Sequence, residues 1–481
     1  MQITASDAQP TTAVPVHDRV ERTWKRFSVT HGFRAILLIA IALRLLLALV
    51  NLEANDDHME VSQVIAFENR IPGDDELYQA YHPKLYHWSV ALLWRALPDQ
   101  SLETATRAAQ LLNVVVGIAT LLVVLRLLHR FRVPASAQLL CFALIALNPR
   151  LIAINAQAAN DTFAIFFGTL ALYFGHIFFD RWSWPSLAGM IAAAVLMSLS
   201  KANGLILMIA IVMMFAIAAV RTQRLTSAGR GRIVLSAAIF MVVWFSTVPW
   251  LGPYARNIRQ AGSPFVSNHD VAPFPDFWKQ TRYGRPGATS IVGGVMTFRF
   301  IDLLRRPMNT QHPTIYPEHR TSYWSQLYGR SHFVHFEMHP ASWRTQNRWI
   351  KWLGRVIFIL ALPPTLIMVA GGVHSVARTA VAVLGRGSAP QGAGDGLLVI
   401  TTLGFVAAGA LYALRQRTFA SMNAIYVMPA IPGFALFFTQ GYQSLLRLRH
   451  GLAWSRRLTL VIGLLLTCYV ADIAVLIYQL R

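Results

Sequence analysis

Eleven long apolar runs constrain the fold of this chain more than any other feature of its sequence. A helix needs about 20 apolar residues to cross the hydrocarbon core of a membrane, and the runs reach or approach that length. They extend over residues 33–52, 105–127, 135–152, 158–179, 186–200, 203–220, 233–254, 352–371, 397–414, 421–440 and 458–479. Only 14% of the 481 residues are charged, against about 25% in soluble domains. The sequence therefore predicts an all-α polytopic membrane protein with about eleven spans, and it excludes a soluble enzyme and a disordered chain.

Basic residues between the runs predict which side of the membrane each loop faces. Five Arg and Lys residues lie between positions 19 and 34, at the amino-terminal side of the first run. The short loops at 126–132, 221–232, 378–386 and 447–457 are also basic. If the runs alternate across the membrane, all of these segments fall on one side. Because cytoplasmic loops carry an excess of Arg and Lys, we expect a cytoplasmic N-terminus and an outer C-terminus. The net charge of +21 is therefore interpreted as membrane topology, and no nucleic-acid partner is expected.

The loops divide the chain into four parts. In chain order these are a cytoplasmic tail at 1–32, a seven-span module at 33–254 with an outer loop at 53–104, a large periplasmic loop at 255–350, and a C-terminal membrane block at 351–481 with a cytoplasmic linker at 385–396. The segment 84–97 is apolar but too short for a span, and it contains charged residues. We interpret it as an interfacial or re-entrant helix on the outer face.

The first outer loop holds the polar residues that best suit chemistry. It begins with a cluster of carboxylates that includes Asp56 and Asp57, directly after the first span. Carboxylates at a membrane exit can act as a general base, bind a metal or be solvated anions. A second stretch, residues 78–87, combines three Tyr, two His and one Lys close to the membrane surface. A merely solvated loop does not require this combination, which favours a functional site.

An acidic pair after the first span, followed by the element His82-Pro83-x-Leu85-Tyr86 before the next, resembles the GT-C membrane glycosyltransferases. The most similar families are the dolichyl-phosphate-mannose protein mannosyltransferases and the bacterial lipid A aminoarabinose transferases. The layout of seven spans, a large outer loop and a variable block of further spans resembles theirs too. The resemblance covers most of residues 33–440 and depends on the order of several short motifs.

The resemblance implies a reaction and a membrane. A sugar would move from a polyprenyl-phosphate carrier to an acceptor hydroxyl, with inversion, on the periplasmic face of the bacterial inner membrane. Partners would be the lipid bilayer, the lipid-linked sugar donor and a glycan, lipid or protein acceptor. The family's base corresponds to Asp57 or Asp56. We favour Asp57, because Asp56 could serve as its orienting neighbour. Two adjacent carboxylates also tend to push their pKa values apart.

The same resemblance implies substrate-binding roles around the first loop. His82 and Tyr86 belong to the shared motif. Lys84 stands where the family has a second proline, and it is either an extra phosphate contact or an interfacial anchor.

Two further motifs flank later spans. Asn160-Asp161 resembles a similar pair in the family. On physical grounds Asn160 could cap the helix while Asp161 faces the cavity, and the alternatives are a capping role alone and a ligand role. Lys201, in the sequence Ser-Lys-Ala-Asn-Gly at 200–204, interrupts an apolar stretch and matches a family lysine that contacts the lipid-linked phosphate. A helix N-terminus with a lysine suits an anion, although a lysine at an interface can also simply extend to water.

A last motif lies near the tenth span. Arg417, Tyr426 and the prolines at 429 and 432 resemble the family's Arg-Tyr-x-x-Pro element. Ile425 stands where that arginine is expected, so Arg417 is either a displaced phosphate ligand or a solvated side chain.

The large loop is rich in histidine. The spacing His332-x-x-His335-x-Glu337-x-His339 places possible zinc ligands together, but no cysteine accompanies them and the spacing matches no zinc signature. We therefore expect no metal and no cofactor in catalysis.

The alternative functions are a transporter or flippase of a lipid-linked intermediate and a non-catalytic scaffold. The absence of an internal repeat disfavours a transporter built from inverted repeats.

Overall fold

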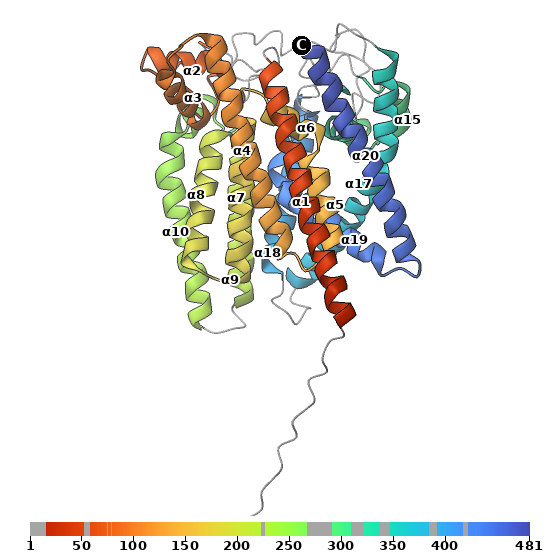
Figure 1. Ribbon diagram of the computed structural model, residues 1–481. Helices are drawn as coiled ribbons and strands as arrows, with labels where there is room; N and C mark the ends of the chain where they lie inside the picture. Colours follow the sequence, from red (N-terminus) through yellow and green to blue (C-terminus); the bar gives the residue numbers. More distant parts are fainter. Residues whose placement is uncertain are drawn as a thin grey trace, which may run out of the picture.

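The chain folds into a bundle of helices that stand side by side (Figure 1). The computed structural model describes residues 16–51, 58–74, 76–77, 79–222, 227–266, 291–308, 322–336, 347–383, 392–416 and 422–481. All regular secondary structure in these ranges is helical, as the apolar runs predict.

Eight helical stretches of the described chain are long and apolar enough to cross a membrane. They lie in α1 (Val16–Val50), α4 (Leu102–Arg130), α7 (Asp161–Asp180), α10 (Ser227–Leu251), α17 (Arg348–Val383), α18 (Ala393–Gln416), the 3₁₀ helix η5 (Ala424–Ala430) with α19 (Ile431–Leu446), and α20 (Gly451–Leu480).

The remaining predicted spans are helical but differ from a full crossing. The run at 135–152 becomes α5 (Ala135–Ala146) and α6 (Pro149–Asn155), which meet at a bend of 51° and bring the count to nine if taken as one span. The runs at 186–200 and 203–220 become the shorter helices α8 (Trp184–Ser200) and α9 (Gly204–Thr222). The structure thus supports eight or nine spans by length and composition, and the larger number of eleven stays a prediction.

Short helices gather at one end of the bundle, which we call the loop end. They include α2 (His58–Phe67), α3 (Leu85–Ala96) and α15 (Phe300–Arg305) (Figure 1). The predicted outer segment 84–97 corresponds to α3, a helix of 12 residues that lies beside α2 rather than through the bundle. Also in the two predicted outer loops are α11 (Tyr254–Ala261), α14 (Ile291–Val295), α16 (Tyr323–His332) and η2 (Val334–Phe336).

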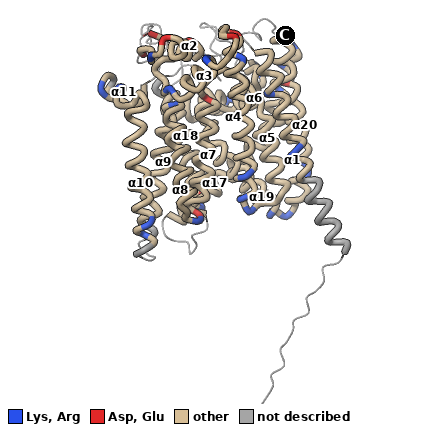
Figure 2. Tube along the Cα trace, turned by 60° about the vertical axis from the view of Figure 1, so that its left-hand side comes forward, with Lys and Arg blue, Asp and Glu red and all other residues tan. Residues whose placement is uncertain are grey.

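Charge differs between the two ends of the bundle. Figure 2 shows acidic residues mainly at the loop end, around α2, whereas the opposite end, near α10 and α19, is predominantly basic. The described start of α1 lies at the opposite end and the C-terminus lies at the loop end (Figure 1). An odd number of crossings gives this arrangement, and the basic end has the charge expected of a cytoplasmic face.

Two glycines allow α17 and α19 to cross closely. A Cβ on Gly371 would come within 1.9 Å of the carbonyl oxygen of Phe437, and a Cβ on Gly441 within 2.0 Å of the carbonyl oxygen of Ile367. Small residues at helix crossings let backbones approach in membrane proteins, where packing replaces the hydrophobic effect between helices.

A buried arginine connects α1 to the bent pair α5 and α6. Arg44 is 0% exposed. Its Nε donates to Asn155 Oδ1 at 2.9 Å, and its Nη1 donates to the carbonyl oxygens of Ala40 and Ala146, each at 2.9 Å. The bend after Ala146 leaves helix-end carbonyls without partners inside the helix, and Arg44 supplies one of the missing donors.

The structure describes two histidines of the large loop, and both contact side chains of the spans. His335 Nδ1 lies 2.6 Å from Asp472 Oδ1, and its Nε2 lies 3.1 Å from Gln479 Oε1, both on α20. His332 contacts the hydroxyl of Tyr469 and lies 3.3 Å from Thr365 Oγ1. These contacts tie the loop to the last span. Glu337 and His339, the other residues whose spacing was considered for zinc, lie outside the described residues.

Candidate functional site

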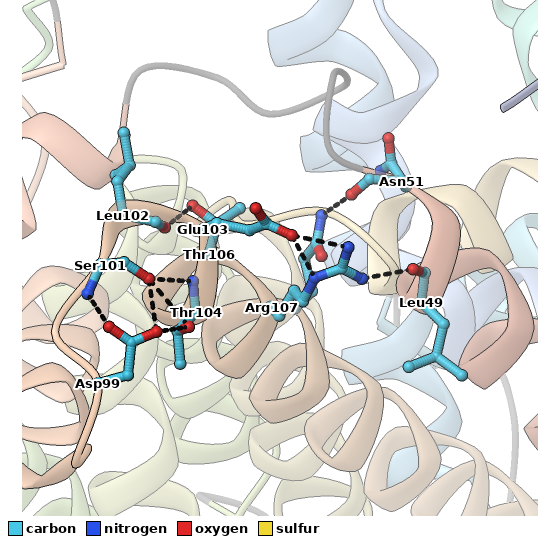
Figure 3. Close-up of polar contacts among 10 residues, drawn as sticks. Leu49, Asn51, Asp99, Ser101, Leu102, Glu103, Thr104, Thr106 and Arg107 are labelled. Carbon is cyan, nitrogen blue, oxygen red and sulfur yellow. Dashed lines mark hydrogen bonds and ion pairs between the residues drawn. The ribbon is translucent and has the colours of Figure 1, made fainter. Parts of the chain in front are cut away.

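The end of α1 is fixed to α4 immediately before the predicted catalytic carboxylates. Arg107 Nη1 donates to the carbonyl oxygen of Leu49 at 2.6 Å, and Gln110 donates to the carbonyl oxygen of Asn51 (Figure 3). Asn51 Nδ2 in turn donates to the carbonyl oxygen of Ala156 at 3.1 Å. The carboxylates themselves, Asp56 and Asp57, lie outside the described residues.

The outer end of α4 is held in a defined position by its own cap. Ser101 accepts a hydrogen bond from the backbone N–H of Thr104, as N-cap serines do, and its hydroxyl lies 2.8 Å from Asp99 Oδ2 (Figure 3). Glu103 accepts from Arg107 at 3.0 Å. The cap and the ion pair orient Arg107 toward the end of α1.

Three histidines come together where α2 and α3 meet, and we call His58, His82 and His87 the histidine cluster. His58 Nδ1 lies 3.0 Å from His87 Nε2, and both side chains are buried. The ring centroids of His58 and His82 are 5.6 Å apart. Tyr86 packs edge-on against His58 at 5.8 Å and against Phe163 of α7 at 5.3 Å, which joins the cluster to the bundle.

The histidine cluster is uncharged at neutral pH. Burial, followed by the nearby charges of Lys201 and Lys84, lowers the pKa of His58 to about 3. Burial, followed by the Lys201 charge, brings the pKa of His82 well below its ordinary value, and the pKa of His87 is likewise lowered by burial. The Nδ1 atoms of His82 and His87 have no hydrogen-bond partner in the described chain. Neutral imidazoles can donate or accept a hydrogen bond without adding charge.

Lys84 holds the turn before α3. Its side chain is 5% exposed, and its Nζ donates to the carbonyl oxygens of Ala80 and His82, the latter at 2.8 Å. Burial lowers the pKa of Lys84 to about 8. The described contacts therefore give this lysine a role in shaping the loop around His82, and its phosphate contact stays a prediction.

Lys201 and Asp161 form an ion pair between the end of α8 and the start of α7. The two side chains are 12% and 6% exposed. Asp161 is the first residue of α7, where the helix dipole favours a carboxylate. Lys201 Nζ also lies 5.7 Å from the ring centroid of Tyr426 in η5. The structure thus brings together three of the predicted site residues, which come from distant parts of the sequence.

The break between α8 and α9 at Lys201 depends on a glycine. Lys201 ends α8 with an extended backbone, and its N–H donates to the carbonyl oxygen of Met197 at 3.0 Å. Gly204 starts α9 so close to the previous turn that a Cβ there would lie 2.6 Å from the Cα of Ser198. Any larger residue would push α9 away from α8.

The predicted cap by Asn160 is wrong. The side chain of Asn160 makes no capping hydrogen bond to α7. Its Nδ2 instead donates to the carbonyl oxygen of Ser200 at 3.2 Å, which fixes the residue before Lys201. A backbone already in the helical conformation at Asn160 (φ −75°, ψ −8°) explains the difference, because N-caps are usually extended.

Unpartnered acceptors surround this ion pair. The amide oxygens of Asn160 and Asn203 are buried and have no hydrogen-bond partner in the described part of the chain. Buried polar atoms are nearly always satisfied in native proteins. Together with Nδ1 of His82, these atoms are available for hydroxyl groups of a ligand.

Other predicted members of the site lie outside the described residues or stand apart. Arg417 is not described. Among the residues that the structure does describe, no group of three or more His, Cys, Asp or Glu is arranged to hold a metal ion. Sequence reasoning did not select His58 and His87 as site residues, and their position beside the acidic pair and the His-Pro motif was the signal that could have found them.

Comparison with known proteins gives a likeness of fold. No protein-family model and no curated protein matches the chain. The apo oligosaccharyltransferase of Archaeoglobus fulgidus superimposes with a TM-score of 0.51 at 15% identity, over 94% of this chain and 56% of that one. The same enzyme tethered to an acceptor peptide containing the NVT sequon gives 0.50 at 16% identity, over 92% and 55%. ArnT from Cupriavidus metallidurans bound to undecaprenyl phosphate gives a TM-score of 0.36 at 14% identity, over 85% of this chain and 76% of that one.

The chain thus spans about half the length of the oligosaccharyltransferase that it matches. At this level of identity the likeness concerns the fold. The oligosaccharyltransferase is a GT-C membrane glycosyltransferase, and the fold of this chain is similar to that of the GT-C enzymes, as its sequence motifs predict.

Proposed function

We propose that this protein transfers a sugar from a polyprenyl-phosphate carrier to an acceptor hydroxyl at the loop end of the bundle, which faces the periplasm. The observation that carries the proposal is the shielded Lys201–Asp161 pair beside unpartnered hydrogen-bond acceptors. A cation of this kind suits a phosphate, and the acceptors suit sugar hydroxyls. The GT-C-like fold supports the same assignment.

In the proposed reaction the acceptor oxygen attacks the anomeric carbon while the bond from that carbon to the phosphate oxygen breaks. The acceptor proton passes to a carboxylate, and the lipid phosphate leaves with an additional negative charge. Asp57 or Asp56 is the proposed base. Lys201 offsets the charge on the leaving phosphate, and attack from the side opposite the phosphate inverts the anomeric centre.

Chain connectivity supports the choice of base. Asp57 directly precedes His58 in the sequence. His58 belongs to the histidine cluster, and the Lys201 charge acts on both His58 and His82. Of the described residues on either side of the acidic pair, Asn51 is held by Gln110 of α4 and His58 contacts His87 of α3.

Transfer from a radiolabelled polyprenyl-phosphate sugar, measured in membranes at matched expression, tests the proposal. The variants are Asp56→Asn, Asp57→Asn and the double substitution. Glu60→Gln is the matched control, because Glu60 is an exposed carboxylate in the first turn of α2. We expect a loss of at least about a hundredfold, or about 2.7 kcal/mol of barrier, from one single substitution, and wild-type transfer from the control.

Unchanged transfer in the double variant would exclude a carboxylate base at these positions. A wild-type protein that moves the intact lipid between leaflets, with no labelled product, would instead favour the flippase.

A further inference from the structure

A small cavity lies at the basic end of the bundle, far from the site proposed for transfer. Its volume is about 50 Å³, which is room for more than one water molecule. Four helices line it: α9 through Met214 and Ile217, α19 through Leu436, and the facing ends of α17 and α18. Met214, Ile217 and Leu436 give the wall an apolar part. Gln440, Asp395 and side chains of α17 give it a polar part.

One face of α17 supplies three polar groups to this cavity. Ser375, Arg378 and Thr379 are three and four residues apart, so they share a face, and all three line the cavity. Ser375 is 6% exposed and its hydroxyl has no hydrogen-bond partner in the described chain. Arg378 is exposed, and it forms no ion pair with any described residue. This face therefore offers a cation and a buried hydroxyl to an anionic ligand.

The start of α18 faces them with a carboxylate. Asp395 lies in the first turn of α18 and lines the cavity. Its Oδ1 lies 3.1 Å from His176 Nε2, and the side chain of Asp395 is 30% exposed. The turn is fixed from the other side by Asp180, whose Oδ1 accepts from the N–H of Gly394 at 3.0 Å. The lining of the cavity therefore includes one positive and one negative side chain, Arg378 and Asp395.

The surroundings indicate a ligand that comes from the membrane. Ser375 precedes the last helical residue of α17 by eight positions, or about 12 Å along the axis. Val373 and Val381 beside it are 67% and 50% exposed, as expected of a surface that contacts lipid. The polar groups thus lie within about 12 Å of the end of α17, next to exposed apolar side chains.

We propose that this cavity binds the head group of a phospholipid that carries both a phosphodiester and a primary amine. Arg378, Ser375 and Thr379 hold the phosphodiester, and Asp395 accepts from the ammonium group. Met214, Ile217 and Leu436 contact the apolar part of the lipid that adjoins the head group. Neither the position nor the charges of this site depend on the proposed transferase activity.

Native mass spectrometry of the delipidated full-length protein tests the proposal. The probes are dioleoyl-phosphatidylethanolamine, dioleoyl-phosphatidylglycerol and inorganic phosphate. We expect one ethanolamine lipid per chain, bound at least about tenfold more tightly than the glycerol lipid. Arg378→Gln should weaken the ethanolamine lipid about tenfold or more, and Ser375→Ala should weaken it less. Arg456→Gln, which removes an exposed arginine in the second turn of α20, is the matched control and should bind as the wild type does.

Asp395→Asn separates the two halves of the head group. It should weaken the ethanolamine lipid and leave the glycerol lipid unchanged, with the melting temperature monitored because Asp395 also contacts His176. Equal binding of both lipids would overturn the amine contact. Displacement of lipid by millimolar inorganic phosphate would identify a site for free phosphate instead, and Arg378→Gln binding like the wild type would overturn the site altogether.

Discussion

Lys201 and Asp161 pair with each other at the loop end, and both are shielded from water. An ion pair in such a place is a weak contributor to stability, because the cost of desolvating two charges offsets most of their attraction. Its usefulness is clearer for binding. In the proposed reaction, the lipid-linked phosphate would meet a cation that is already desolvated and that is oriented by Asp161 and by the ring of Tyr426.

Substitution of both partners separates the structural from the binding role of this pair. Lys201→Met leaves a buried carboxylate alone, and Asp161→Asn leaves a buried ammonium alone, so each should cost about 3–5 kcal/mol of stability. The double variant should recover most of that loss. Transfer should stay reduced a hundredfold or more in the double variant, with a raised KM for the donor. The melting temperature and the transfer rate of the double variant distinguish the two roles. Recovery of both would show that Lys201 has only a structural role.

The histidine cluster should make the protein sensitive to acid. The pKa of His58 is lowered to about 3 in the folded state and is about 6.5 when unfolded. Between these values the unfolded chain binds more protons, so stability is full above about pH 6.5 and falls as the pH is lowered toward 3. Each such histidine contributes up to about 1.4 kcal/mol per pH unit. His82 and His87 shift in the same direction.

Melting temperatures between pH 8 and pH 4.5 measure this effect. Replacement of His58 by Gln should flatten the acid limb, while His450→Gln, in the basic loop before α20, should leave it unchanged. Parallel acid limbs in wild type and His58→Gln would contradict a neutral, buried His58.

The close crossing of α17 and α19 should tolerate no side chain at Gly441. A Cβ there would lie 2.0 Å from the carbonyl oxygen of Ile367, so even alanine must push the helices apart, and we expect a loss of several kcal/mol. Gly463→Ala in α20 is the control, because nothing lies within 4 Å of a Cβ at that position. It should be neutral or slightly stabilising, since alanine is the better helix former. Equal melting temperatures of the two variants would count against this crossing.

Asp472 should be required to hold the large loop on the last span. Its two oxygens lie 2.6 Å from His335 Nδ1 and 2.8 Å from the backbone N–H of Val334. Asp472→Leu leaves both groups buried without an acceptor and should cost about 3–5 kcal/mol, whereas Asp472→Asn should cost less. Limited proteolysis of the loop gives the readout, with Asp302→Asn in the exposed helix α15 as the control. Cleavage of the Leu variant at the wild-type rate would contradict the anchoring role.

The helical fold could be predicted from the apolar runs because hydropathy reports which segments avoid water. It could not be predicted where a run breaks. Pro149 bends one run, and Lys201 with Gly204 separates two short helices. These breaks depend on partners from elsewhere in the chain, such as Arg44 at the first break and Asn160 at the second.

The candidate site was predictable only in part for the same reason. Lys201, Asp161 and Tyr426 carried signals of their own, and the structure brings them together. The pairing of His58 with His87 depends on the angle between two short helices, which no local pattern encodes. His332 and His335 had a spacing that suits zinc, but their partners on α20 lie more than a hundred residues away.

Arg44 has a consequence for how the protein is made. Its charge lies within the first span, and its partners in the bundle are Ala146 and Asn155, which are synthesised 102 and 111 residues later. Until those residues arrive, the first span enters the membrane with a guanidinium that only its own helix contacts. Insertion of the first helix and formation of the α5–α6 bend are therefore coupled, because only the bend supplies the remaining acceptors for the guanidinium of Arg44.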